Sequence, residues 1–189
     1  MRILGLDPGT ATTGYGVIDT DGNRAKAVDH GAVYTSSEQP LPQRVLSLFE
    51  QISSIMDRWR PDAVAVEEVF FNRNVRSALA VGQARGTLLL AAAQRNIPVF
   101  SYTPLEVKMA LTGQGRAPKE QVGFMVRALL RLPEIPRPDD AADALALAVC
   151  CWHKQPWDQK VRQARAGQVR SAPESRGGPA SPAGVGETS

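Results

Sequence analysis

The sequence has few of the residues on which several common protein chemistries depend. Its 189 residues include only two cysteines, Cys150 and Cys151, and only two histidines, His30 and His153. Adjacent cysteines are poorly placed for a structural disulfide and lack the spacing of metal ligands, so we expect two free, mostly buried thiols. The histidines lie outside every motif described below. We therefore expect no histidine chemistry.

Long hydrophobic segments are also lacking. No run approaches 18 apolar residues, and the apolar start of the chain is interrupted at Asp7. These features exclude a transmembrane helix and a signal peptide, so we expect no membrane contact and a cytoplasmic location. A hydrophobic content of 43% over 189 residues instead indicates a globular domain of ordinary size.

The small net charge of +3 hides an uneven distribution. Residues 58–131 carry 11 basic and 5 acidic side chains, whereas residues 1–57 carry 4 and 7, and residues 132–152 carry 1 and 4. A basic middle between acidic ends is expected if a polyanion lies beside a carboxylate-rich centre.

The hydrophobic pattern predicts an α/β domain over residues 1–153. We expect strands at 2–7, 15–19, 25–34, 62–69 and 97–102, and helices at 41–60, 75–95, from 104, 118–132 and 138–152. An Asp-Gly turn at residues 21–22 makes the first three strands antiparallel. The fourth strand follows a helix and is therefore expected to run parallel to the first. Residues 154–189 are rich in Gly, Pro, Ser and Ala and are expected to form a disordered, mildly basic tail.

Four acidic residues occupy positions that suit a catalytic or metal-binding site. Asp7 and Glu67 come at the carboxyl ends of two strands that we expect to be parallel, which is where open α/β sheets bind ligands. Asp140 and Asp143 are three residues apart and share one face near the start of the last helix, among alanines that allow close docking. Four crowded carboxylates favour Mg²⁺ or Mn²⁺. Each acid taken alone also fits an ordinary turn, helix cap or solvated strand end.

Several short motifs resemble the RuvC family of Holliday junction resolvases. They are LGLDPGT at residues 4–10, GYG at 14–16, VEEVF at 66–70, GQARG at 82–86 and DAADALA at 140–146, and they occur in order with the family's spacing over residues 1–153. The resemblance implies a ribonuclease H-like fold, with a five-stranded mixed sheet and helices on both faces. It also implies a homodimer that nicks two opposed strands of a four-way DNA junction, leaving 5′-phosphate and 3′-hydroxyl ends.

The resemblance further implies roles for individual residues. The catalytic carboxylates, which would bind two Mg²⁺ ions or Mn²⁺ in their place, are Asp7, Glu67, Asp140 and Asp143. Lys119 would stabilise developing charge, and Lys108 would hold a phosphate. DNA contacts are expected from Phe70, which would wedge or stack at the junction centre, and from Arg73, Arg76 and Arg85. The helix that follows Phe70 is a candidate dimer surface, and kinship implies contact with a branch-migration helicase complex.

Three other functions are considered. The segment at residues 7–14 also resembles the phosphate-binding hairpin of actin-like and sugar-kinase ATPases, but about 153 residues are too few for their two lobes. An RNA-processing nuclease of the ribonuclease H-like group would use similar carboxylates. A catalytically silent junction-binding module is disfavoured because the acids are intact.

Overall fold

The computed structural model describes residues 1–68 and 75–154 of the chain, so the expected tail lies outside the described residues. The strands are β1 (Arg2–Asp7), β2 (Thr12–Asp21), β3 (Arg24–Tyr34), β4 (Ala63–Glu67) and β5 (Val99–Tyr102). The helices are α1 (Leu41–Trp59), α2 (Val75–Gln94), α3 (Pro104–Thr112), α4 (Lys119–Leu130) and α5 (Asp139–Lys154). The order of the elements is the one expected from the hydrophobic pattern.

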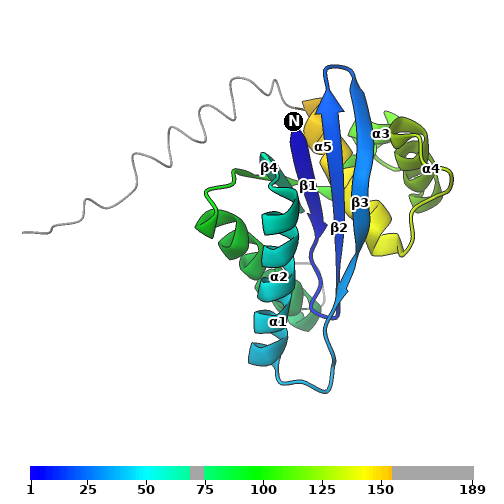
Figure 1. Cartoon of the computed structure of the whole chain (residues 1–189). Coiled ribbons are helices and arrows are strands. Elements are labelled where there is room, and N and C mark those ends of the chain that lie inside the picture. Colours follow the sequence, from blue (N-terminus) through cyan, green and yellow to red (C-terminus); the bar gives the residue numbers. More distant parts are fainter. Residues whose placement is uncertain (69–74, 155–189) are drawn as a thin grey trace, which may run out of the picture.

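The strands form one mixed sheet in the order β3-β2-β1-β4-β5 (Figure 1). β1, β2 and β3 are antiparallel, while β4 runs parallel to β1 and β5 runs parallel to β4. The hairpin between β2 and β3 turns at Gly22, whose positive φ of 53° suits glycine. This topology confirms the predicted α/β class with a five-stranded mixed sheet. The second strand is longer than expected, since it begins at Thr12 rather than Tyr15.

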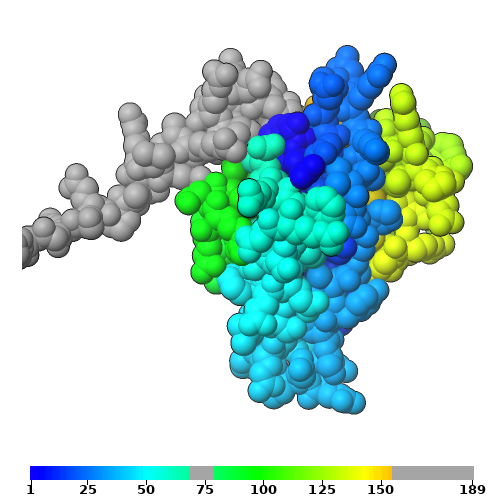
Figure 2. Space-filling view, viewed as in Figure 1, coloured from blue at the N-terminus to red at the C-terminus, as the bar shows by residue number. Residues whose placement is uncertain are grey.

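Helices cover both faces of the sheet. α1 and α2 pack on one face over a core that includes Leu48, Ile52 and Leu88, and α3, α4 and α5 lie on the other (Figure 1). In Figure 2, α2 (green) and α4 (yellow-green) lie on opposite sides of the molecule. No described helix combines the length and the apolar character needed to span a lipid bilayer.

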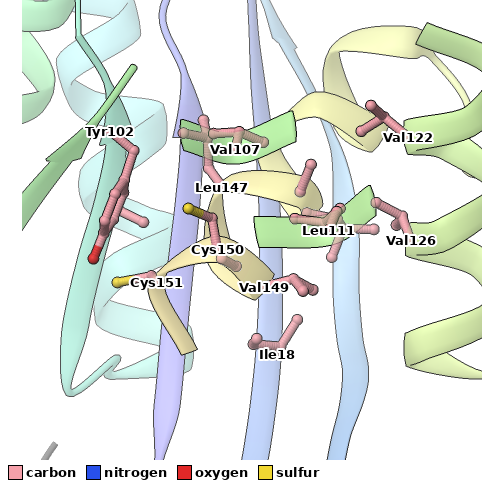
Figure 3. Packing of buried hydrophobic residues seen from close by; sticks show 14 of the residues in the cluster. Ile18, Tyr102, Val107, Leu111, Val122, Val126, Leu147, Val149, Cys150 and Cys151 are labelled. Carbon is pink, nitrogen blue, oxygen red and sulfur yellow. The ribbon is translucent and has the colours of Figure 1, made fainter. Parts of the chain in front are cut away.

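α5 is the central helix of its face, and it fills the core shown in Figure 3. Cys150 and Cys151 are buried there with free thiols, as expected. Burial raises the pKa of each thiol to about 12. These cysteines therefore act as small apolar core residues rather than as nucleophiles.

Two strand glycines let α5 lie directly on the sheet. A Cβ atom on Gly5 would be 1.9 Å from the backbone oxygen of Ala144, and one on Gly14 would be 2.0 Å from that of Asp140. No side chain fits at either position, so the helix backbone contacts the strand backbone. Gly82 and Gly86 of α2, by contrast, face open space within the described residues.

Candidate active site

Asp7 and Glu67 lie next to each other at the carboxyl ends of β1 and β4. The register of these parallel strands pairs Leu6 with Val66, the residues immediately before the two acids. Each carboxyl group shifts the pKa of the other, so the two side chains lie within interaction distance. The structure therefore brings together the first two acids singled out in the sequence.

The first half of α5 carries Asp140 and Asp143 to the same edge of the sheet. The close contact of this helix with Gly5 and Gly14 sets its depth on the sheet. The negative charges of both aspartates raise the pKa of Asp7, so both lie within electrostatic reach of it. Segments that are far apart in the sequence thus contribute to one acidic cluster.

A cavity of about 230 Å³ opens at this cluster. Three of the four predicted acids line it, namely Asp7, Glu67 and Asp143. Lys108 from α3 and Lys119 from α4 also line it, and the remaining wall is apolar. Asp140 is not among the lining residues, although its charge reaches Asp7. The cavity therefore places acidic and basic side chains around one space that is open to a ligand.

The acids at the strand ends are buried enough to resist ionisation. Burial, followed by the charges of Glu67, Asp143 and Asp140, raises the pKa of Asp7 to about 7, and Lys119 partly opposes this rise. Burial and the charge of Asp143 also raise the pKa of Glu67, while its hydrogen bond with Asp7 acts in the opposite direction. A site with these properties favours a positively charged ligand.

Lys119 already neutralises part of the cluster. Its Nζ lies 2.8 Å from Oδ2 of Asp143 and 3.6 Å from Oδ2 of Asp139. These carboxylates raise the pKa of Lys119, with the hydrogen bond to Asp143 as the largest cause. Lys108 has no ion-pair partner among the residues that the structure describes. One lysine of the cavity is thus engaged with the acids, and the other is available to an anion.

The chemistry of the donors fits a hard divalent cation. Carboxylate oxygens are ligands that Mg²⁺ and Mn²⁺ prefer, and a cation would relieve the repulsion that raises the pKa of Asp7. In residues 1–68 and 75–154, however, no group of three or more Asp, Glu, His or Cys side chains is arranged as a finished metal site. Asp143 is paired with Lys119. Holding a cation with all four acids therefore requires Asp143 to leave Lys119 and Asp140 to turn toward the cavity.

Arg85 supports the site from α2, a role that the sequence did not indicate. Its Nε donates to the backbone oxygen of Glu67 over 3.1 Å, and its Nη2 donates to Oγ of Ser101 over 2.8 Å. Ser101 is on β5, so one guanidinium joins the ends of two strands. We had expected Arg85 to contact a phosphate, but the structure directs two of its nitrogens to the protein itself.

The turn that follows Asp7 is held in a similar way by Arg44. This side chain, in the first turn of α1, donates from Nη2 to the backbone oxygen of Thr10 over 2.8 Å and from Nε to Oγ1 of Thr35 over 3.1 Å. The Thr35 hydroxyl also donates to the Thr10 oxygen. Nothing in the hydrophobic pattern links Arg44 to the end of β1, because this contact exists only after the chain has folded.

The side chains of the remaining predicted DNA contacts lie outside the described part of the chain. Phe70 and Arg73, together with Phe71, lie outside the described residues. Arg76 belongs to the first turn of α2, but its side chain is not among those described.

The chain matches a known protein family over most of its length. A family model described as "Crossover junction endodeoxyribonuclease RuvC" matches residues 3–151. A protein with the same description from Pelotomaculum thermopropionicum is 52% identical over 162 residues, which cover 86% of this chain and 99% of the relative. Another, from Desulforamulus reducens, is 57% identical over 150 residues, covering 79% of this chain and 92% of the relative.

Solved structures of RuvC proteins are also similar to this chain. The Thermus thermophilus RuvC structure aligns with a TM-score of 0.74 at 42% identity, covering 79% of this chain and 92% of that one. Thermus thermophilus RuvC in complex with a Holliday junction substrate aligns with a TM-score of 0.77 at 40% identity, covering 89% and 97%. The yeast mitochondrial resolvase Ydc2, with a TM-score of 0.57 at 15% identity, shares the fold.

Proposed function

The chain belongs to the RuvC family of crossover junction endodeoxyribonucleases, and we propose that it resolves four-way DNA junctions by metal-dependent nicks on two opposed strands. The observation that carries this proposal is the cavity in which Asp7, Glu67 and Asp143 face Lys108 and Lys119. Metal-dependent nuclease chemistry uses this combination, because acids hold the cation while bases hold the phosphate.

The four carboxylates are proposed as the ligands of two divalent cations, Mg²⁺ or Mn²⁺. When bound, such a pair lowers the pKa of a water and stabilises the departing 3′ oxygen. Asp7 and Glu67 would hold the cations at the strand ends, because both acids are largely buried and end two adjacent parallel strands. Asp140 and Asp143 complete the set from α5. The products are a 5′-phosphate and a 3′-hydroxyl.

The two lysines of the cavity are proposed to act on the DNA phosphate. Lys119, which lines the cavity, is positioned to neutralise the charge that grows on the phosphate oxygens during cleavage. Lys108 is proposed to hold the phosphate, because its position at the cavity leaves it available to an anion. Loss of Lys119 should lower the rate of cleavage, and loss of Lys108 should weaken binding.

We propose that the enzyme is a homodimer joined through α2. The exposed stripe of this helix consists of Leu79, Gly82, Gly86 and Leu90, which recur on one helix face. Leu79 and Leu90 are 60% and 53% exposed, and both glycines face open space. Two copies of such a stripe can approach closely about a two-fold axis. The two active sites would then face opposed strands of one junction.

The outer DNA contacts are proposed from the family resemblance. Phe70 is expected to stack or wedge at the open centre of the junction, and Arg73 and Arg76 to bind phosphates beside it. The relative from Thermus thermophilus binds a Holliday junction substrate, which supports the same ligand here. Contact with a branch-migration helicase complex is proposed on kinship alone.

The function is tested by incubating the full chain with four-way, duplex and single-stranded DNA and with structured RNA, with and without Mg²⁺. We expect paired, symmetric cuts in the four-way DNA alone, and only when the cation is present. Cleavage of RNA but not of the junction would favour the RNA-processing alternative. Junction binding without cleavage in Mg²⁺ or Mn²⁺ would overturn the proposed chemistry.

A further inference from the structure

Lys119 stands between two aspartates of the same helix that have different surroundings. Asp143 lines the active-site cavity with Asp7 and Glu67. Asp139, the first residue of α5, does not line it and is not among the charges that raise the pKa of Asp7. It lines a neighbouring cavity of about 160 Å³, which Lys119 and Asp143 also border. Lys119 therefore belongs to both cavities, whereas Asp139 belongs to the outer one alone.

The pairing of Lys119 with Asp143 conflicts with the proposed use of Asp143 as a cation ligand. The ammonium occupies Oδ2 of Asp143 at 2.8 Å. A divalent cation bound by the same carboxylate would repel that ammonium at short range. When a cation takes Oδ2 or chelates both oxygens of Asp143, Lys119 is displaced, and it loses its main partner unless a second carboxylate is within reach.

Asp139 is such a carboxylate. Its Oδ2 is already 3.6 Å from Nζ of Lys119, so a small rotation of the lysine side chain completes the contact. Its Oδ1 accepts from Nη1 of Arg137 at 2.7 Å. The two oxygens of Asp139 thus contact two different basic side chains. Arg137 holds Oδ1, which leaves Oδ2 facing Lys119.

We propose that Asp139 is a positioning residue that receives Lys119 when Asp143 turns to a bound cation. The proposal rests on the cation site proposed above, and it adds a residue that does not itself touch the cation. Asp139 would keep the lysine beside the cavity and prevent it from competing for Asp143. Asp139 therefore promotes cation binding through Lys119 rather than through its own charge.

The proposal is tested by measuring Mn²⁺ binding to the full chain by titration calorimetry, without DNA and independently of cleavage. Asp139→Asn should weaken Mn²⁺ binding about two- to fivefold, the range set by one exposed ion pair. Lys119→Met should tighten binding, because the competing ammonium is gone. In the Lys119→Met background, Asp139→Asn should have no further effect. Asp139→Glu, which keeps the carboxylate, should restore most of the affinity.

Glu120→Gln is the matched control, because Glu120 borders the same outer cavity and follows Lys119 directly. If Asp139→Asn weakens Mn²⁺ binding equally with and without Lys119, or no more than Glu120→Gln does, Asp139 acts only through its charge and the proposal is overturned. If the wild type fails to bind Mn²⁺, or if Asp7→Asn binds it normally, the cation site itself is wrong and both proposals fall.

Discussion

Arg85 donates a hydrogen bond from Nε to the backbone oxygen of Glu67, over 3.1 Å, at the point where β4 ends. The side chain of Glu67 reaches the active-site cavity, while Arg85 approaches its backbone from α2. A second hydrogen bond, to Ser101, ties the same guanidinium to β5. The position of a proposed cation ligand thus depends on a helix whose described side chains do not line the cavity.

Arg85→Gln is expected to slow cleavage about thirtyfold while leaving junction affinity within about threefold. Two hydrogen bonds at the strand end are lost, each worth about 1 kcal/mol, and about 1.4 kcal/mol corresponds to a factor of ten in rate. Single-turnover cleavage and gel-shift binding measure the two effects separately. Arg127→Gln, which removes an equal charge from α4, should change neither. If Arg85→Gln instead weakens binding and reduces its salt dependence, Arg85 contacts a phosphate.

Asp7→Asn is expected to abolish cleavage and leave junction binding largely intact, because Asp7 is proposed to hold the cation rather than the DNA. Gel-shift and cleavage assays on the same preparation give both values. Glu68→Gln is the control, since Glu68 is exposed and does not line the cavity. A purified Asp7→Asn variant that still cuts would show that the cation is held elsewhere.

Asp7→Asn is also expected to increase the free energy of unfolding, and this increase should be larger at high pH. The folded-state pKa of Asp7, about 7, is above the ordinary value of 3.8, so the folded chain binds this proton more tightly than the unfolded chain does. The contribution of Asp7 to the free energy of unfolding is therefore fully present below pH 3.8 and is lost as the pH rises through 7. Without divalent cations, the gain from Asp7→Asn should be on the order of 2 kcal/mol larger at pH 8 than at pH 5. Urea unfolding at the two pH values measures it, and an equal gain at both would contradict the raised pKa.

The elements could be predicted because their signals are local. Apolar residues at helical spacing predicted α1, and a continuous apolar run ending in two acids predicted β4. The proximity of acids at strand ends can also be predicted once the strands are expected to be parallel. For this reason Asp7 and Glu67 were predicted to lie close together.

The missed contacts depend on which elements pack together. Gly5 and Gly14 appear in the sequence only as weak strand residues, since glycine reveals nothing about what will approach it. Only the packing of α5 shows why a side chain is excluded there. Likewise, Arg44 and Arg85 look like surface cations, and their backbone acceptors at Thr10 and Glu67 become neighbours only through tertiary structure.

Leu79→Glu is expected to convert the proposed dimer into a monomer. A carboxylate from each subunit would be buried without a partner at a two-fold interface, which costs several kcal/mol and should raise the dimer dissociation constant about a hundredfold or more. Sedimentation velocity measures this, and the variant should also lose paired cutting of the junction. Phe124→Glu on α4, where the replaced side chain is 55% exposed, is the control and should remain dimeric. A dimeric Leu79→Glu variant would place the interface elsewhere.

The last prediction concerns the link between α3, which carries Lys108, and α5, which carries Asp143. Lys154 Nζ lies 2.6 Å from Oε1 of Glu106, while Oε2 of Glu106 accepts from the backbone of Thr103 over 2.9 Å. These contacts, with the lysine as the largest cause, lower the pKa of Glu106 from 4.5 to about 2. A lowered pKa contributes stability above pH 4.5, and this stability is lost as the pH falls towards 2.

Lys154→Met should therefore destabilise the chain at pH 7 and have almost no effect at pH 2. The loss should be only about 0.5 kcal/mol, because both side chains are more than a third exposed and solvent screens the pair. Urea unfolding across this range measures the loss, and NMR titration should show the pKa of Glu106 rising towards 4.5. Arg24→Met on β3 removes the same charge from a side chain with no ion pair among the described residues, and it should leave the pKa of Glu106 unchanged. An unchanged pKa in Lys154→Met would mean that the Thr103 backbone alone holds Glu106, so that α3 and α5 are joined by apolar packing and not by this ion pair.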